Sequence, residues 1–174
     1  SPWATIQGTI DRYEVKFGDT IIVKEGTYTE NINVTKQLHL YADNGAEVTV
    51  VANDPADHVF EVSIDNVSIY DFNIYGAVGP GIAGIYLGPG VDNCIINWNR
   101  IGLDAANLNN IGLLLDNARN NEITGNEIVA TDSGISLVSS DDNDIFDNTA
   151  SDSATGINLA ASSGNVIYTN NFFN

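Results

Sequence analysis

The second half of the chain repeats two short motifs in alternation. The first is a glycine, an aliphatic residue, a variable residue and a leucine, with four copies at 84–87, 112–115, 134–137 and 156–159. The second is an isoleucine followed three positions later by an asparagine, with copies at 96–99, 123–126, 145–148 and 167–170. Its last three copies follow each other at a step of 22 residues. Repeats of roughly 20 to 50 residues are typical of chains that stack small units into a solenoid.

Side-chain alternation inside the repeat predicts short β-strands separated by bends. Ile135 and Leu137 flank Ser136, so two apolar side chains point inward and the polar one points outward. The alternation breaks near Asn126, where we expect a bend, because asparagine tolerates left-handed backbone angles. One unit of this length cannot bury its own apolar face. Stacked copies can, with each strand paired to its equivalent about 4.8 Å away along the axis, which predicts a parallel β-helix.

The asparagine of the second motif recurs once in each unit. Equivalent side chains of stacked coils lie one above another, so their amides can bond to each other and to the backbone of the bend. We therefore interpret this column as structural rather than catalytic. The expected ladder consists of Asn99, Asn126, Asn148 and Asn170.

The N-terminal quarter of the chain contains the one helix that we predict, over residues 5–15. Ile6, Ile10 and Tyr13 recur there at helical spacing. The segments that follow are rich in Val, Ile, Tyr and Thr and are bounded by Gly, Asn or Asp, as is typical of strands. These strands are expected at 20–23, 28–34, 38–41 and 48–51.

Two parts of the sequence are similar to known β-helix families. The run ATIQ at 4–7 and the run GDTIIVKEGTYTENI at 18–32 resemble the opening coil of pectin-lyase-like right-handed β-helix proteins. The later repeats resemble those of NosD-type and archaeal cell-surface proteins. The resemblance implies an all-β fold, a single-stranded right-handed parallel β-helix of roughly six or seven coils with a short N-terminal capping helix. We expect one domain over 1–174, with the cap at 1–18 and the coils over 19–174.

The chain is strongly acidic. Its 6 basic residues face 23 acidic ones, which gives a formal charge of −17. No nucleic-acid partner is expected, because such binding depends on neutralising phosphates with Lys and Arg. No membrane insertion is expected either, because the uncharged stretch 74–91 holds too many glycines and prolines for a spanning helix. Cations and neutral or cation-bridged polymers are the electrostatically favoured partners.

Sequence signals for export are sparse. The runs NVT at 33–35 and NVS at 66–68 fit the N-glycosylation sequon. A lone Cys94 excludes an intramolecular disulfide bond. The chain begins without a charged and apolar leader, so we expect that any signal peptide has been removed. Together with the resemblance, these signals favour an extracellular or cell-surface location.

The enzymes of the pectin-lyase-like superfamily would leave recognisable residues. Pectate lyases combine calcium-binding aspartates with a basic arginine, whereas only Arg100 and Arg119 follow position 36 here. Arg119 aligns with Asp141 one coil later, which predicts an ion pair that braces two coils. The polygalacturonase signature is represented only by Asp141 and Asp142, and pectin methylesterase resemblance stops after the opening coil. No residue is therefore assigned a catalytic role, although a polysaccharide lyase or hydrolase stays the alternative.

The metal sites that the sequence could form are considered by the type of ligand that each metal requires. Copper or zinc would require His, Cys or Met ligands, and the chain offers His39, His58 and Cys94 on different coils and no methionine, so no soft-metal site is expected. Calcium prefers clustered oxygens. Acidic residues gather on two adjacent coils. We interpret them either as a calcium site or as an acidic edge that is simply exposed to solvent. The candidate calcium ligands are Asp141, Asp142 and Asp144.

Aromatic residues recur at one outward position of the repeat. When the coil of Ile69 is aligned with the four motif copies, the residue after each aligned isoleucine is Tyr70, Asn97, Thr124, Phe146 or Tyr168, and Trp98 lies one position further than Asn97. Aromatic rings on a flat sheet pack against sugar C–H faces, so we name a candidate carbohydrate-binding set. Stacking that merely stabilises the sheet and a protein interface are the alternatives. The candidate set is Tyr70, Trp98, Phe146 and Tyr168.

The sequence stops at 170–174, inside a repeat and without a capping segment. We expect either a piece of a longer chain or an end-to-end protein contact at the uncapped C-terminal coil. The favoured function is a non-catalytic extracellular or cell-surface module that recognises carbohydrate or protein, as part of a surface-layer or adhesin-like protein. Its expected partner is a polysaccharide or a surface glycoprotein. A purely structural spacer is a further alternative.

Overall fold

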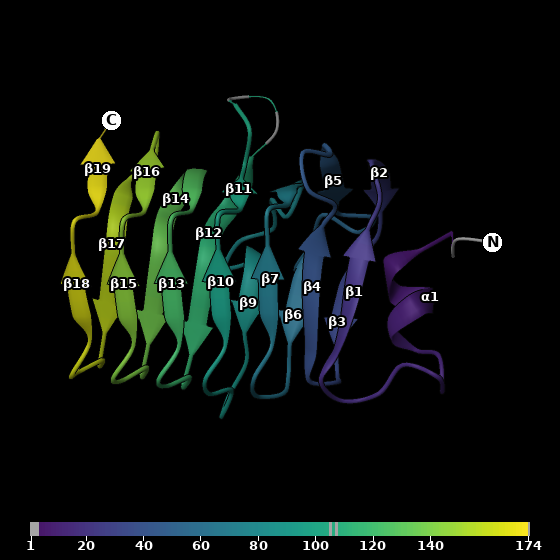
Figure 1. The fold of residues 1–174 in the computed structure, drawn as a ribbon. Helices are drawn as coiled ribbons and strands as arrows, with labels where there is room; N and C mark the ends of the chain where they lie inside the picture. The colour runs from purple at the N-terminus through teal and green to yellow at the C-terminus, as the bar shows by residue number, and fades with distance from the viewer. Residues whose placement is uncertain (1–3, 105, 107, 174) are drawn as a thin grey trace.

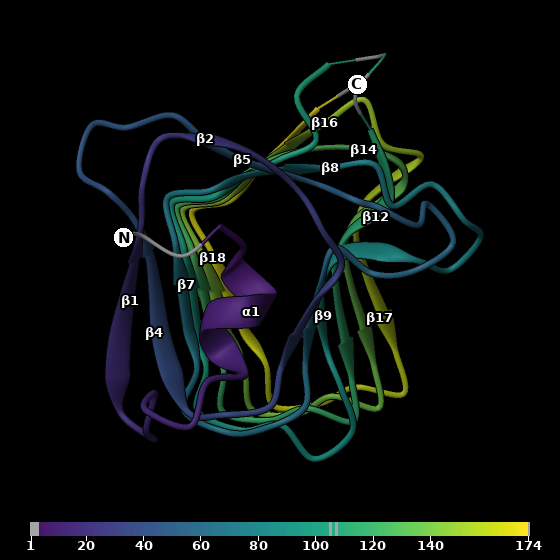
Figure 2. The same ribbon diagram turned by 90° about the vertical axis from the view of Figure 1, so that its right-hand side faces the viewer.

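The computed structural model describes residues 4–104, 106 and 108–173. Short parallel strands stack into a right-handed β-helix in which each coil turns around one hydrophobic core (Figure 1). Viewed along the axis, the coils superimpose and leave three strand-bearing faces (Figure 2). The described residues form six complete coils and the first two strands of a seventh. The predicted fold class is confirmed.

The first face is a seven-stranded parallel sheet. Each of its strands begins a coil. They are β1 (Asp19–Val23), β4 (Leu38–Ala42), β7 (Ser68–Tyr70), β10 (Ile95–Asn97), β13 (Glu122–Thr124), β15 (Asp144–Phe146) and β18 (Val166–Tyr168).

The second and third faces belong to one continuous sheet, because the long strand β14 (Glu127–Val138) runs across the corner between them. The second face also contains β2 (Gly26–Thr29), β5 (Val48–Val51), β8 (Asn73–Tyr75), β11 (Arg100–Ile101), β16 (Thr149–Ser151) and β19 (Asn171–Phe173). The third face also contains β3 (Ile32–Val34), β6 (Phe60–Val62), β9 (Ala83–Leu87), β12 (Asn109–Asp116) and β17 (Thr155–Ala160).

The register of the sheets follows the sequence repeat. Ile123 pairs with Ile96 on one side and with Ile145 on the other. On the third face Ile135 likewise lies between its equivalents in β12 and β17. These isoleucines point inward and are fully buried. Each coil therefore buries its apolar side chains against the coils on both sides, which a single unit could not do.

The predicted asparagine ladder is confirmed at the corner between the first and second faces. The backbone N–H and the side-chain Nδ2 of Asn99 both donate to Oδ1 of Asn126, at 3.0 and 3.1 Å. Asn126 makes the same pair of bonds to Asn148. Asn148 in turn makes them to Asn170, which completes the predicted column. The bonds satisfy buried backbone groups where the strands stop, so the column is structural.

A second ladder at the opposite end of the first face was not predicted. Asn121 donates from N and Nδ2 to Oδ1 of Asn143, and Asn143 does the same to Asn165. The column ends at Cys94, whose N–H donates to Oδ1 of Asn121 at 2.8 Å. The available signal was the asparagine two residues before each of the last three motif isoleucines, which recurs at the same step of 22.

The predicted helix over 5–15 is wrong in length. Helix α1 spans Ile6–Ile10, and the chain continues in turns that leave Tyr13 80% exposed. The physical reason is the ammonium group of Lys36, which is distant in the sequence and bonds to the backbone where the helix ends. Lys36 donates from Nζ to the carbonyl oxygens of Ile10 and Val15, at 2.6 and 3.2 Å, and so holds the chain after the helix in turns.

The strand predicted over 28–34 is also wrong, because it is two strands. β2 ends at Thr29 and β3 begins at Ile32, so the corner between the second and third faces falls between them. The carboxylate of Glu30 at this corner accepts the backbone N–H groups of Ile6 and Gln7, both at 2.9 Å. The corner therefore doubles as the cap of the first turn of α1.

Helix α1 covers the N-terminal end of the core (Figure 2). Ile6 and Ile10 are buried against it, which confirms the expected capping role. At the other end of the described chain, large apolar side chains stay open to solvent in β17, β18 and β19, including Leu159 at 47% and Phe173 at 52% exposure. No helix in the described ranges is long and apolar enough to cross a membrane.

Candidate functional site

From the third coil onward, each coil passes from the first to the second face through one residue with a left-handed backbone. The φ angles in this corner column lie between 53° and 66°. In three of these corners the residue's N–H donates to the strand-end carbonyl of the next coil, as Trp98 does to Thr124 at 3.2 Å. The column consists of Asp71, Trp98, Gly125, Asp147 and Thr169.

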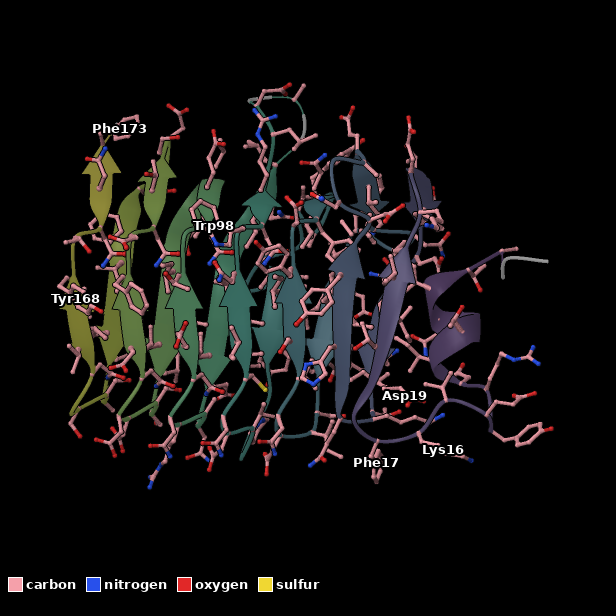
Figure 3. The ribbon with its side chains drawn as sticks, in the orientation of Figure 1. Lys16, Phe17, Asp19, Trp98, Tyr168 and Phe173 are labelled. Atoms are coloured by element: carbon pink, nitrogen blue, oxygen red, sulfur yellow. The ribbon has the colours of Figure 1, made fainter. Side chains whose placement is uncertain are left out.

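Trp98 is the unexpected member of this column. A left-handed conformation with φ of 56° costs a bulky residue about 1–2 kcal/mol, and glycine, asparagine or aspartate normally takes such a position. The indole is 59% exposed, so no gain from core burial offsets this strain. It stands out from the corner above β10 (Figure 3). A strained, exposed aromatic residue points to a role other than folding.

Gly125 in the next coil makes room for the indole. A Cβ atom added to Gly125 would lie 3.1 and 3.2 Å from two ring atoms of Trp98. The ring therefore rests over the backbone of the following corner, where any larger side chain would displace it. This contact fixes the ring in place on the outside of the solenoid.

Tyr70 and Asp71 lie one coil before Trp98, on the other side from Gly125. Tyr70 is 36% exposed, and its ring meets that of Tyr41 edge-on at 5.5 Å between centroids. Partial burial raises the pKa of the Asp71 carboxyl group. Because adjacent coils are about 4.8 Å apart, Tyr70, Asp71 and Trp98 form one short surface, which we call the Trp98 ridge.

Asn97 is the last residue of β10 and directly precedes Trp98. It pairs with Tyr70 on one side and Thr124 on the other. Its Oδ1 atom is buried and has no hydrogen-bond partner within the described part of the chain. Such an unpaired oxygen costs free energy and is a second local departure from the well-satisfied corners of the other coils.

The other two candidate aromatic residues form a separate pair. Phe146 and Tyr168 stack with ring centroids 5.0 Å apart and an angle of 10° between the planes. The coil between this pair and Trp98 contributes Thr124, which is buried, and Gly125, and neither residue carries a ring. The four predicted residues therefore lie in two pairs rather than in one continuous strip. Their role in carbohydrate binding stays a prediction.

The three candidate calcium ligands do not converge. Asp141 accepts hydrogen bonds from the N–H and hydroxyl of Ser163, which lower the pKa of its carboxyl group. It also lies 3.4 Å from Nη2 of Arg119, so the predicted ion pair between these coils is confirmed. Asp142 occupies a left-handed turn, and Asp144 stands at the start of β15. Across the described ranges, no three His, Cys, Asp or Glu side chains are placed to hold a metal ion.

A polar cluster on the third face was not predicted. The ring of His58 stacks on Tyr86 at 4.3 Å between centroids, and the Tyr86 hydroxyl donates to Asp116 at 3.3 Å. Burial lowers the pKa of His58, and burial together with the Asp116 carboxylate raises the pKa of Tyr86. The backbone N–H of Ala83 donates to Nδ1 of His58 at 2.9 Å, so the neutral ring carries its proton on Nε2.

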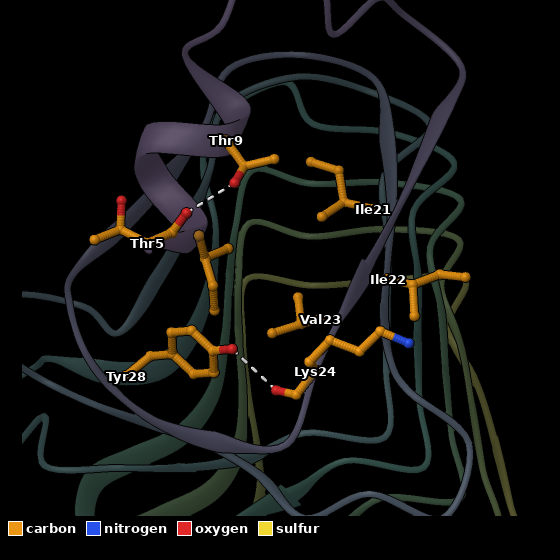
Figure 4. A pocket seen from close by; sticks show the side chains of 8 residues that line it. Thr5, Thr9, Ile21, Ile22, Val23, Lys24 and Tyr28 are labelled. Atoms are coloured by element: carbon orange, nitrogen blue, oxygen red, sulfur yellow. Dashed lines mark hydrogen bonds between the residues drawn. The ribbon is translucent and has the colours of Figure 1, made fainter. Parts of the chain in front are cut away.

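A small cavity of about 210 Å³ opens beside α1 (Figure 4). Its walls are mainly apolar and come from the helix and from β1 and β2, with Ile21 and Val23 among them. The Tyr28 hydroxyl donates to the carbonyl oxygen of Lys24 at 3.0 Å along one side. The cavity lies where the short helix covers only part of the first coil, so we assign it to imperfect capping.

Comparison with known proteins gives the family. The family model described as "Periplasmic copper-binding protein (NosD)" matches residues 8–174. The chain belongs to the NosD family. All of the described strands lie inside the match, as do both asparagine ladders.

Two further likenesses agree with this assignment. A cell surface glycoprotein of Methanothermus fervidus is 36% identical over 96 residues, which is 55% of this chain but only 15% of the relative. A crystal structure of the pectin methylesterase from Aspergillus niger in deglycosylated form superimposes with a TM-score of 0.51, covering 94% of this chain and 83% of the other. A second form of that enzyme gives the same TM-score at 13% identity. At 14% and 13% identity, the esterase likeness shows the fold alone.

The soft-donor residues of this NosD family member do not fit a copper site. His39 lies on the first face, His58 beside the third face, and Cys94 in the core, and the chain has no methionine. Burial raises the pKa of Cys94 to about 11, which keeps it a thiol rather than the thiolate that binds metals. Both ring nitrogens of neutral His58 are occupied, one by the Ala83 N–H and one by its own proton. No step of the function proposed below therefore involves copper.

Proposed function

We propose that this NosD family member is a non-catalytic cell-surface module that binds a polysaccharide at the Trp98 ridge. The family description names a periplasmic protein and the Methanothermus fervidus relative is a cell surface glycoprotein, which supports a location outside the cytoplasm. The chain spans about a seventh of that relative, so a surface-layer or adhesin-like parent protein is part of the proposal.

The observation that carries the proposal is the conformation of Trp98. Its exposed indole is held over Gly125 at a strained corner, one coil after Tyr70 and Asp71. An aromatic face offers apolar contact to sugar C–H groups, and a neighbouring carboxylate accepts hydrogen bonds from sugar hydroxyls. A uronic-acid polymer would meet repulsion from a chain of net charge −17, which favours a neutral polysaccharide.

A variant at the corner separates binding from folding. Trp98→Gly removes the ring and places a glycine where φ is already 56°, so the free energy of unfolding is expected to stay equal or to rise by up to about 1 kcal/mol. Binding to neutral polysaccharides on a glycan array is expected to disappear. Thr169→Gly is the matched control, because it introduces a glycine in the same corner column without removing an aromatic ring.

Binding to the glycan array is measured with and without calcium. In parallel, the protein is incubated with the same polysaccharides and assayed for new reducing sugar ends and unsaturated products. Binding without product, lost in Trp98→Gly and kept in Thr169→Gly, supports the proposal. Release of product would favour the lyase or hydrolase alternative. A wild-type chain that binds no glycan would contradict the carbohydrate proposal, and capture of a protein partner through the same ridge would favour recognition of a surface glycoprotein.

A further inference from the structure

The sequon at 33–35 lies on the outer side of β3, the edge strand of the third face. Strand alternation buries Ile32 and Val34 completely and turns Asn33 outward into solvent. Thr35 is also exposed, and two residues further along an extended chain it lies on the same side as Asn33. In the part of the chain that the structure describes, hydrogen bonds reach the backbone of Asn33 but not its side-chain amide.

The free edge of β3 is covered by a side chain rather than by another strand. Oε1 of Gln7 accepts the N–H of Asn33 at 2.7 Å, and Nε2 of Gln7 donates to the Asn33 carbonyl at 3.3 Å. Gln7 lies in α1, a helix of only 5 residues. A local opening of this cap exposes the backbone around Asn33 without separating any two coils. Terminal elements with few contacts open at low free energy compared with the core.

The surroundings of Asn33 have room for a sugar. An open hollow of about 670 Å³ lies between the cap and the corner of the second and third faces, with Asn33 on its wall. Asn53 and Asp54 also line it, and the Asn53 amide can donate to and accept from sugar hydroxyls while the Asp54 carboxylate can accept from them.

The second sequon, at 66–68, has a different environment. Asn66 is exposed, but the Ser68 side chain is buried at 7% exposure within the first face. Its hydroxyl lies 3.0 Å from Nδ1 of His39 in the neighbouring strand. Asn66 itself sits in a left-handed turn, and its N–H donates to Asp92 of the next coil. Reaching both side chains of this sequon would require opening the β-helix between coils.

We propose that Asn33 carries an N-linked glycan and that Asn66 does not. In the transfer, Nδ2 of Asn33 forms a bond to the anomeric carbon of a polyprenyl-phosphate-linked oligosaccharide, and the bond from that carbon to the carrier oxygen breaks. The carrier phosphate leaves with the electron pair, and the amide loses one proton to a base of the transferase. The inference rests on the location outside the cytoplasm proposed above, and it is independent of any ligand at the Trp98 ridge.

The test is secretion of the chain by a host that modifies N-x-S/T sequons, followed by mass mapping of both sequon peptides before and after treatment with peptide N-glycosidase. The wild type is expected to carry a glycan on the Asn33 peptide in most molecules. Asn33→Gln and Thr35→Ala are expected to lose it, and Thr35→Ser to keep it. Thr35→Ala leaves the amide in place, so its effect reports sequon recognition rather than damage to the cap.

Circular dichroism on each secreted variant shows whether the β-helix has formed. An unmodified Asn33 in folded wild-type protein would overturn the proposal, as would equal occupancy of Asn33 and Asn66. Ser68→Ala is expected to change nothing in the glycan pattern, and a loss of glycan in that variant would also contradict the assignment. The glycan pattern does not depend on whether Trp98→Gly loses polysaccharide binding. Either proposal can therefore be contradicted without the other.

Discussion

At the scale of single residues, the strongest departures from the repeat are Trp98 and Cys94. Trp98 stands where other coils use Asp, Gly or Thr, and Cys94 stands where the next three coils use asparagine. The first is exposed and strained and underlies the proposed binding site. The second is fully buried, and its sulfur accepts the N–H of Val67 at 3.4 Å in place of an asparagine oxygen.

Cys94 gives a prediction about alkaline stability. Burial raises the pKa of its thiol from 9.0 to about 11, so the folded state disfavours the thiolate relative to the unfolded state. The stability that the protonated Cys94 thiol contributes to the folded state is fully present below pH 9 and is lost as the pH rises toward 11. We expect the free energy of unfolding to fall by about 2–3 kcal/mol across that window, measured by urea unfolding.

The control is Cys94→Asn, which places an amide among the ladder groups that the sulfur now contacts, including the Ile64 carbonyl oxygen. We expect this variant to fold. Its free energy of unfolding should no longer show the part of the decrease above pH 9 that Cys94 causes. The folded wild type should also resist a thiol reagent that labels it readily in urea. Rapid labelling of the folded chain would contradict the buried, protonated thiol.

At the scale of elements, the asparagine ladders hold the corners where strands stop. Asn126 accepts two bonds from Asn99 and donates to the carbonyl oxygens of Ile96 and Thr124 and to Asn148. Removal of the amide would leave the buried backbone N–H of Asn99 without its partner and would take one hydrogen bond from each of the other groups. The ladders therefore explain why polar residues recur inside an otherwise aliphatic core.

We expect Asn126→Ala to lower the free energy of unfolding by about 3 kcal/mol, because it orphans the buried N–H of Asn99 at a cost of roughly 1–3 kcal/mol and removes several further hydrogen bonds worth roughly 0.5–1.5 kcal/mol each. Asn170→Ala in the last coil is the matched control. Asn170 is only half-buried, so water can replace its bonds and a loss of about 1 kcal/mol or less is expected. Equal losses in the two variants, measured by chemical unfolding, would contradict the ladder account.

At the scale of the whole molecule, the two ends of the β-helix differ. Helix α1 is anchored by Glu30 at its start and by Lys36 at its end, and it closes the first coil. The coil of β18 and β19 leaves Tyr168 and Phe173 about half exposed. The end-to-end protein contact predicted from the sequence at this coil stays a prediction.

We expect hydrogen exchange to be fastest in β18 and β19 and to slow toward the middle coils, because a solenoid loses structure from its least supported end. A self-associating chain would show slower exchange in β19 as its concentration rises. Phe173→Ser is expected to remove that concentration dependence, as sedimentation velocity can check. Uniform protection along the axis at low concentration would contradict fraying from this end.

The sequence by itself determined the coil. A residue spacing of 22 puts equivalent side chains one above another, so the inward isoleucines, the bend near Asn126, the first ladder and the Arg119–Asp141 pair all followed from alignment of the repeats. Such features depend on neighbours related by the repeat itself. The same alignment also placed the aromatic candidates on one side of the molecule.

Only the tertiary structure decided features that depend on residues outside the repeat. Helix α1 is capped at its start by Glu30 and ended by Lys36, both more than 20 positions away in the sequence, and no local pattern shows that. The left-handed strain at Trp98 and the space above Gly125 exist only once two coils are stacked. Exposure also separates the sequon at Asn33 from the one at Asn66, because burial is a property of packed coils and not of the motif.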